Sequence, residues 1–462
     1  MPPPAAPSHL QADLEHLEVL AHAPVYAHDG LIANLDEIYG RIASAHFSDY
    51  DIAEITKAAP DLMYRLFDLR MALRANADQY RQRGLMSAAA AAKLRDCMRI
   101  LRYVTDLLGE IAAGHPRTNE GDAPRRAFTG GNRSTLVNWA FYDGKDIVFR
   151  AGDVVVMRGH AHNSAAIARI GDVDSQFSHA AIVHIDEAGR HWMVESLIED
   201  GAIINPLAHS IGHGIARAAL YRHRDAALAA KAGTLAYEHV AASRKPLARR
   251  ILYDFTMRLD QRRRLFCAKL VRLAYQKASG GTVNLPSYPT HIVMKNRDFL
   301  NRIGVKAAET FAPADMDVEP RFDLVAEWQD YRETSNVRLQ DFTMDKLFEW
   351  MEDPRYGYRF VETFMVRVVS IFGRLAAHLS DSAKEFMSSV VPRVPINMPR
   401  KTVAAVAMLH KTAEPIYREL QDMERVCIAK TGRPLIGAEI YAALEAIRAR
   451  DGDRIGYLVR RV

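Results

Sequence analysis

The stretch that decides the fold is FSHAAIV, residues 177–183, in which His179 opens a run of β-favouring residues. The next such run is WMVES, residues 192–196, and Glu195 lies near its end. Between them lies DEAGR, residues 186–190, a short turn with a glycine suited to positive φ, so we predict a β-hairpin. In this hairpin the histidine falls within a residue or two of the position opposite the glutamate. A one-residue slip would reverse the face, and then each polar residue would only solvate the end of its strand.

A cysteine opens a predicted helix further along the chain. Cys267 begins the run CAKLVRLAY, three arginines at 262–264 precede it, and Lys269 follows it. Free backbone N–H groups at a helix N-terminus and nearby cations stabilise a thiolate. A free cysteine is more often a buried apolar residue. That alternative fits Cys97 and Cys427, which sit within helical runs, better than it fits Cys267.

The histidine, the glutamate and the cysteine have complementary chemistry. A thiol needs a base to become a thiolate, and the base needs an acceptor that holds its tautomer. Cys267, His179 and Glu195 supply these three functions in principle. In a papain-type site the cysteine precedes the histidine along the chain. The reversed order here indicates a circularly permuted version of the same machinery.

Composition sets the class of protein. A chain of 462 residues predicts two or three domains. No apolar stretch free of charged residues is long enough to span a membrane, and the first residues lack a basic segment followed by an apolar one. Three scattered cysteines favour a reducing compartment. We therefore expect a cytoplasmic protein, with export by an unconventional route as the alternative. The net charge of +5 is too mild to indicate a nucleic-acid partner.

The pattern of residues changes three times along the chain. Residues 1–115 have apolar positions at helical spacing, and 116–135 form a polar linker rich in glycine and proline. Short β-favouring runs and two helices then predict an α+β catalytic domain at 136–312. These runs include residues 147–149. Residues 320–462 are predicted to be helical again, from about Asp323.

Five motifs follow one another in the central region. They are AGDVV at 151–155, FSHAAIV at 177–183, VES at 194–196, YDF at 253–255 and FCAKLV at 266–271. In order and spacing they resemble the permuted papain-like amidases of the YiiX/YaeF type, relatives of the NlpC-type cell-wall peptidases and of the lecithin–retinol acyltransferase-like enzymes. The resemblance covers roughly residues 140–310. It implies an α+β fold, with a circularly permuted papain-like (NlpC-type) core and an antiparallel sheet, flanked by N- and C-terminal helical regions.

The resemblance also implies a role for each site residue. Cys267 would be the nucleophile, His179 the general base and acid, and Glu195 the acceptor that orients the imidazole. The backbone N–H of Cys267 would be one oxyanion donor, and the hydroxyl of Tyr253 a weaker candidate for a second. Thiolate would attack an amide or ester carbonyl, and water or another nucleophile would release the acyl group from the thioester.

One departure affects the substrate contacts. The family often has a serine and a glutamate directly after the cysteine, where this chain has Ala268 and Lys269. As candidate substrate contacts we take Lys269, Arg264, Arg158 and His160, the last two for their position at the end of the predicted strand 153–157. Arg264 closes a basic stretch that begins at Arg244; such a run is usually a solvated face, and otherwise attracts an anionic substrate.

Histidine pairs raise the question of a metal. His160 and His162 form one pair and His209 and His213 another. A structural zinc site needs four protein ligands and a catalytic site needs three, and no such set of ligands stands together in the sequence. We therefore predict no metal and no cofactor.

Three functions fit these observations. The first is a cysteine hydrolase, an amidase or peptidase that cleaves an amide bond through a Cys-His-Glu thioester mechanism. The second is a lipid acyl hydrolase or acyltransferase on the same fold, favoured by the basic stretch and by the apolar run 359–379, which could lie on a membrane surface but is more often a buried bundle helix. The substrate would be an anionic peptide or lipid. The third is an inactive scaffold that binds other proteins through its helical regions.

Overall fold

The computed structural model describes residues 9–46, 49–113, 133–142, 147–172, 174–212, 215–294, 296–353, 355–358 and 398–460. The predicted run 359–379 and most of the predicted linker 116–135 lie outside these residues.

The described N-terminal region is helical, as its periodicity predicts. Its helices are α1 (His9–His22), α2 (His28–Ala43), α3 (Ile52–Gln82) and α4 (Ala88–Ala113). Leu62, Leu66, Leu69 and Leu73 recur at helical spacing on α3 and are all buried, because this stripe faces the other helices. The helices α3 and α4 pack along each other, and α2 packs on α4.

The centre of the molecule is a seven-stranded sheet in which every pair of neighbours is antiparallel. The strand order is β1-β9-β6-β2-β3-β4-β5. The strands are β1 (Arg133–Val137), β2 (Val154–Gly159), β3 (His179–Ile185), β4 (His191–Leu197), β5 (Gly201–Pro206), β6 (Ile215–His223) and β9 (Phe322–Asp330). Together with the helices, this sheet confirms the predicted α+β class with an antiparallel sheet.

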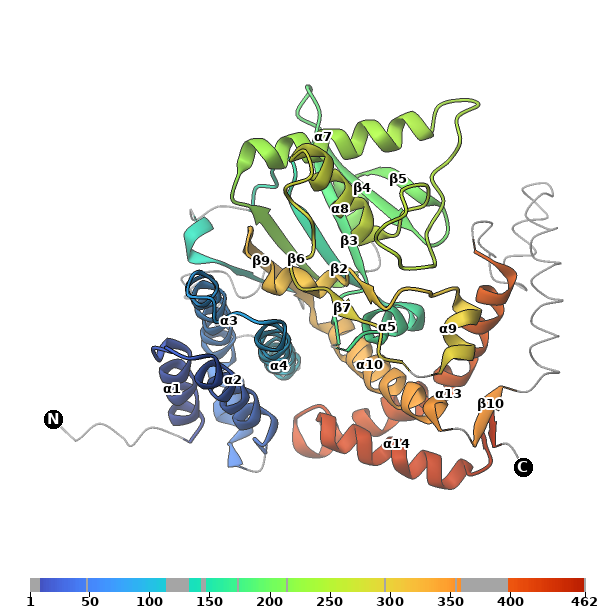
Figure 1. Cartoon of the computed structure of the whole chain (residues 1–462). Coiled ribbons are helices and arrows are strands. Elements are labelled where there is room, and N and C mark those ends of the chain that lie inside the picture. Colours follow the sequence, from blue (N-terminus) through green and yellow to red (C-terminus); the bar gives the residue numbers. More distant parts are fainter. Residues whose placement is uncertain are drawn as a thin grey trace.

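Two helices cover one face of this sheet. α7 (Ala226–Ser243) and α8 (Cys267–Ala278) pack on each other and on β3 and β4 (Figure 1). Gly152 lets α7 approach closely: it has φ +87°, and a Cβ there would lie 2.1 Å from the backbone oxygen of Ala229. Alternate residues of β3 join two different apolar clusters, Ala180 with α8 and Ala181 with the opposite face.

The C-terminal region is mostly helical. α10 (Tyr331–Glu352) packs between α4 and α13 (Arg400–Thr431), and α14 (Gly437–Asp451) contacts both α10 and α13 (Figure 1). A small sheet of β10 (Tyr356–Tyr358), β12 (Leu458–Arg460) and β11 (Arg454–Ile455) lies at the end of the chain.

Short elements complete the central region. They are the 3-10 helices η2 (Trp139–Phe141) and η3 (Pro313–Val318), the helices α5 (His162–Arg169), α6 (Leu207–Gly212) and α9 (Arg297–Ile303), and the paired strands β7 (Thr290–His291) and β8 (Glu309–Thr310).

The structure differs from the sequence prediction at both borders of the core. Residues 147–149 form no strand. The prediction of a helix from Asp323 was wrong, because Phe322–Asp330 forms β9, which pairs with β6 along one edge and with β1 along the other. The sheet therefore extends beyond 136–312 in both directions, and β1 begins within the range predicted as linker. Among the described residues, no helix is long and apolar enough to cross a membrane.

Candidate active site

The hairpin brings His179 and Glu195 together. Ile182 pairs with Val194, and continuing this register sets Glu195 opposite Ala181, two positions from His179. An even offset keeps both side chains on one face of the sheet. His179 Nε2 lies 2.8 Å from Glu195 Oε2, which leaves Nδ1 as the ring nitrogen for the thiol.

Two further side chains fix the carboxylate. Glu195 Oε1 accepts hydrogen bonds from Asn205 Nδ2 at 2.9 Å and from Ser210 Oγ at 2.7 Å. Burial alone would raise the pKa of Glu195, but the bonds from His179, Ser210 and Asn205 hold it below its usual value. Sequence reasoning missed Asn205 and Ser210, because neither lies in a motif; they reach the site from β5 and α6.

Cys267 occupies the first turn of α8 and is buried. Its sulfur is hydrogen-bonded to His179 and to the backbone N–H groups of Ala180 and Ala268. Burial disfavours the thiolate, yet these three partners together lower the pKa of the Cys267 thiol. Since one donor comes from β3 and one from α8, the packing of this helix on this strand creates the thiolate environment.

The pKa of His179 shifts in the opposite direction from that of Cys267. Burial disfavours the imidazolium, but hydrogen bonds and charge from Cys267 and Glu195 raise the pKa of His179 to about 10. A lowered thiol pKa beside a raised imidazole pKa favours a thiolate–imidazolium pair near neutral pH.

Tyr253 also reaches the sulfur. Burial, followed by the negative charge of Cys267, raises the pKa of Tyr253 well above its usual value, and its hydroxyl is hydrogen-bonded to Cys267. A neutral phenol beside the nucleophile can donate to an oxygen that becomes negative there. The structure thus places the candidate oxyanion donor against the nucleophile.

Lys269 does not point toward a substrate. Its Nζ donates to Asp254 Oδ2 at 2.6 Å, and both side chains are buried. The predicted substrate contact at Lys269 is therefore wrong, because burial and the carboxylate hold the ammonium away from solvent. The pair instead ties α8 to the segment that carries Tyr253.

Arg158 is likewise buried away from the site. Its Nη2 donates to Asp341 Oδ1 at 2.6 Å, and its guanidinium is fully buried, so the predicted cleft contact is wrong. His160 lies 3.8 Å from Glu333, and Arg264 is exposed. Neither lines the two cavities beside the cysteine.

Two cavities of opposite character adjoin the site. One is apolar and has Cys267 in its wall. The other is more polar and is lined by His179, Glu195 and Asn205. Tyr253 lines both, so the reacting groups lie where the two cavities meet.

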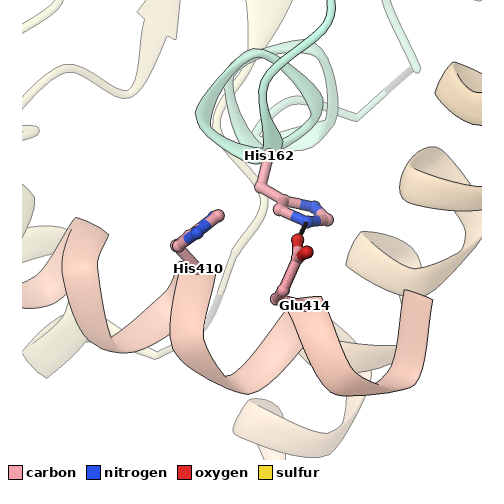
Figure 2. A group of neighbouring side chains, drawn as sticks. All are labelled: His162, His410 and Glu414. Atoms are coloured by element: carbon pink, nitrogen blue, oxygen red, sulfur yellow. Dashed lines mark hydrogen bonds and ion pairs between the residues drawn. The ribbon is translucent and has the colours of Figure 1, made fainter. Parts of the chain in front are cut away.

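A possible cation site borders the apolar cavity. His162, His410 and Glu414 each offer a ligand atom, and the three atoms lie within 4.8 Å of one another. Figure 2 shows His162 on α5 above the two α13 residues. Three protein ligands suit a catalytic zinc.

The hydrogen bonds that Glu414 already makes in this cluster favour a structural role over cation binding. Glu414 Oε2 lies 2.9 Å from His162 Nε2, and Glu414 Oε1 accepts from Arg418 Nε at 2.8 Å. A guanidinium on the same carboxylate competes with a cation. We interpret the cluster as a joint between α5 and α13, and the expectation of no metal stays a prediction.

Comparison with known proteins gave one match. Residues 148–326 match the family model described as permuted papain-like amidase enzyme, YaeF/YiiX, C92 family. The searches of curated proteins and of solved structures found no match. The matched range holds Cys267, His179 and Glu195, five whole strands of the sheet and the first half of β9, and it confirms a cysteine-type hydrolase at the level of the family. Residues 148–326 of this chain therefore match the permuted papain-like amidase family, YaeF/YiiX type.

Proposed function

We propose that this protein is a cysteine amidase that cleaves an amide bond through a thioester on Cys267. The observation that supports it most is the continuous set of hydrogen bonds from the Cys267 sulfur through His179 to Glu195, with Glu195 itself held by two donors. A buried cysteine without a catalytic role has no need of a histidine oriented by a fixed carboxylate.

The reaction has two steps. The Cys267 thiolate attacks the carbonyl carbon and forms the C–S bond, and the C–N bond breaks as His179 gives its proton to the leaving amine. His179, now neutral, takes a proton from water, whose oxygen attacks the thioester carbonyl. The C–S bond then breaks, which releases the carboxylic acid and regenerates the thiolate–imidazolium pair of Cys267 and His179.

The negative oxygen of each tetrahedral intermediate needs donors. The backbone N–H of Cys267 stands at the first position of α8, where helix geometry provides no intrahelical acceptor. The Tyr253 hydroxyl beside the sulfur is the second donor. Asn205 and Ser210 act one step away, since they hold Glu195, which orients His179.

A second candidate is hydrolysis or transfer of an acyl group from a lipid ester. The same two steps apply with an alcohol as the leaving group, and the apolar cavity at Cys267 favours this candidate. The exposed arginines at 262–264 lie close to the nucleophile in sequence and would attract an anionic head group. The third reading, an inactive scaffold, is opposed by the hydrogen bonds of the trio.

Trapping of the intermediate tests the proposal. We expect p-nitrophenyl acetate, quenched in acid, to leave one acetyl group on the peptide that contains Cys267, detected by mass spectrometry. Glu195→Gln should acylate more slowly, because a neutral amide stabilises the imidazolium less. The matched control is Cys427→Ser, a partly exposed cysteine distant in sequence, which should acylate as the wild type does. Acetylation of Cys427 in place of Cys267 would contradict the proposal.

A further inference from the structure

Two loops between α7 and α8 are strongly basic. The first, residues 244–250, follows the end of α7 (Figure 1), and the second, residues 258–264, leads toward α8. Their exposed cationic side chains are Lys245, Arg249, Arg250, Arg258, Arg262, Arg263 and Arg264. The loops hold one carboxylate, Asp260, and it pairs with Arg258. The other six cations have no ion pair among the residues that the structure describes.

Backbone contacts hold the two loops side by side. Leu252, just after the first loop, forms a parallel bridge with Arg264, so the cations that precede each of these residues lie on the same side of the bridge. The first loop is also fixed at its base. Arg244 Nε donates to the carbonyl oxygen of Ala202 at 2.9 Å, and the N–H of Ala202 donates to the carbonyl oxygen of Ile251 at 2.9 Å. We call the cations of both loops, together with the tip of the first loop, the basic surface.

An apolar tip stands among these cations. Pro246, Leu247 and Ala248 are all exposed at the turn of the first loop, and the relative exposure of Leu247 is 107%. Leu247 also has φ +67°, in the left-handed region that favours glycine. Both the contact with water and the backbone conformation of this leucine are unfavourable in the free protein. These costs point to a bound state in which the Leu247 side chain leaves water.

A bilayer with anionic head groups suits both features of the basic surface. Lysine and arginine side chains near such a bilayer are attracted by its negative surface potential. An apolar side chain can enter the boundary between head groups and acyl chains. A nucleic acid or an acidic peptide would pair with the cations but would offer Leu247 no comparable apolar layer. Charge and apolar tip together therefore favour a lipid surface over a soluble polyanion.

We propose that the basic surface docks this protein on an anionic phospholipid bilayer, with Leu247 inserted between the head groups and the cations of both loops against their negative groups. The docking needs no thioester chemistry, so it goes beyond the proposed function. Cys267 follows Arg264 by three positions, which the chain can span by at most about 11 Å. Docking would therefore bring the nucleophile near the bilayer surface.

Vesicle binding tests the proposal. The full chain with Cys267→Ala, which leaves the lipids intact, is sedimented with vesicles of phosphatidylcholine and phosphatidylserine at about 0.1 M salt. We expect Leu247→Ala to weaken binding about tenfold, because the inserted apolar surface is lost. The triple substitution Arg262→Glu, Arg263→Glu, Arg264→Glu should weaken it at least about 100-fold. Vesicles of phosphatidylcholine alone should bind little of the unsubstituted Cys267→Ala protein.

The matched controls lie elsewhere on the surface. Val19 on α1 is 66% exposed, so Val19→Ala removes an exposed apolar side chain away from the basic surface. Lys401, Lys411 and Lys430 on α13 are exposed, and changing all three to glutamate alters the net charge as much as the arginine triple does. Because salt screens charges beyond about 10 Å, both controls should bind the anionic vesicles within about twofold of the Cys267→Ala protein. Circular dichroism checks that all variants fold.

Each outcome decides for or against the basic surface. Losses with Leu247→Ala and the arginine triple, with both controls unaffected, would support the docking. No binding to the anionic vesicles, or an equal loss in the lysine triple, would overturn it. Displacement of the protein by single-stranded DNA, with Leu247→Ala as tightly bound to vesicles as its parent, would also overturn it, because a general polyanion site behaves in that way. None of these results bears on acylation of Cys267, which the trapping experiment tests separately.

Discussion

His179→Ala is expected to lower kcat/KM by about 10²–10⁴-fold. The substitution removes the proton donor for the leaving group and the cation that stabilises the Cys267 thiolate. Burial lowers the pKa of His179, but Cys267 and Glu195 outweigh it and raise this pKa to about 10. The imidazolium is therefore present near neutral pH, where the loss should be largest. Initial rates with a chromogenic acyl anilide, taken between pH 5 and 9, measure the effect.

A second histidine in the same hairpin serves as the control. His191 opens β4 and is exposed, so His191→Ala should keep the wild-type rate within about a factor of two, as expected for surface positions. Circular dichroism of both variants checks that they fold. If His179→Ala and His191→Ala hydrolysed the substrate equally well, His179 would have no part in the chemistry.

Glu327→Gln is expected to lower the free energy of unfolding by about 3–5 kcal/mol. Glu327 Oε1 accepts from Arg70 Nη1 at 2.6 Å and from Arg102 Nη2 at 2.8 Å, and all three side chains are fully buried. The amide leaves two buried guanidinium groups short of one negative charge. Urea unfolding followed by tryptophan fluorescence measures the change.

The same carboxylate predicts a pH dependence. Burial would raise the pKa of Glu327, but Arg102 and Arg70 lower it to about 2. Its contribution to stability is therefore complete above the pKa of an unfolded glutamate, about 4.3, and is lost as the pH falls toward 2. Glu327→Gln should remove this part of the acid transition.

An exposed ion pair provides the control for that experiment. Glu419 accepts from Arg450 at 2.7 Å, and their side chains are 38% and 57% exposed. Solvent screens such a pair, so Glu419→Gln should cost at most about 1 kcal/mol. Equal effects at Glu327 and Glu419 would mean that the buried carboxylate does not hold the N-terminal helices to the sheet.

Buried charges of this kind explain how the flanking helices are fixed. Arg70 on α3 and Arg102 on α4 meet Glu327 on β9, and Arg338 on α10 pairs with Glu110 on α4 at 2.8 Å. Since each pair satisfies groups from two regions of the chain, the helices form one packed unit with the catalytic core. The apolar cavity depends on this packing.

The hairpin and the Cys267 helix could be predicted from sequence because their signals are local. Alternation, a glycine turn and a short separation predicted that β3 and β4 pair as a hairpin, and the motif order indicated the fold. The turn allowed several registers, so contact between His179 and Glu195 needed the structure.

The errors arose where distant partners decide the outcome. Arg158 and Lys269 were predicted to be free cations because neither ion partner is evident from the sequence. Asp341 lies 183 positions from Arg158, and Asp254 lies outside α8, in the segment that precedes it. The strand β9 was missed because its pairing with β6, about a hundred residues earlier in the chain, outweighs local propensity. The walls of the apolar cavity could not be predicted either, because they come from residues far apart in the sequence.

The most direct test of the central claim is the pH dependence of Cys267 alkylation by iodoacetamide in the wild type, His179→Ala and Glu195→Gln. Cys97 is the internal reference, since burial raises its pKa to about 12. We predict that the wild-type thiol reacts well below the free-thiol pKa of about 8.5, that His179→Ala moves the midpoint up to or above that value, and that Glu195→Gln falls between them. Identical profiles near pH 8.5 for all three proteins would contradict the thiolate–imidazolium pair and with it the proposed catalytic role of Cys267.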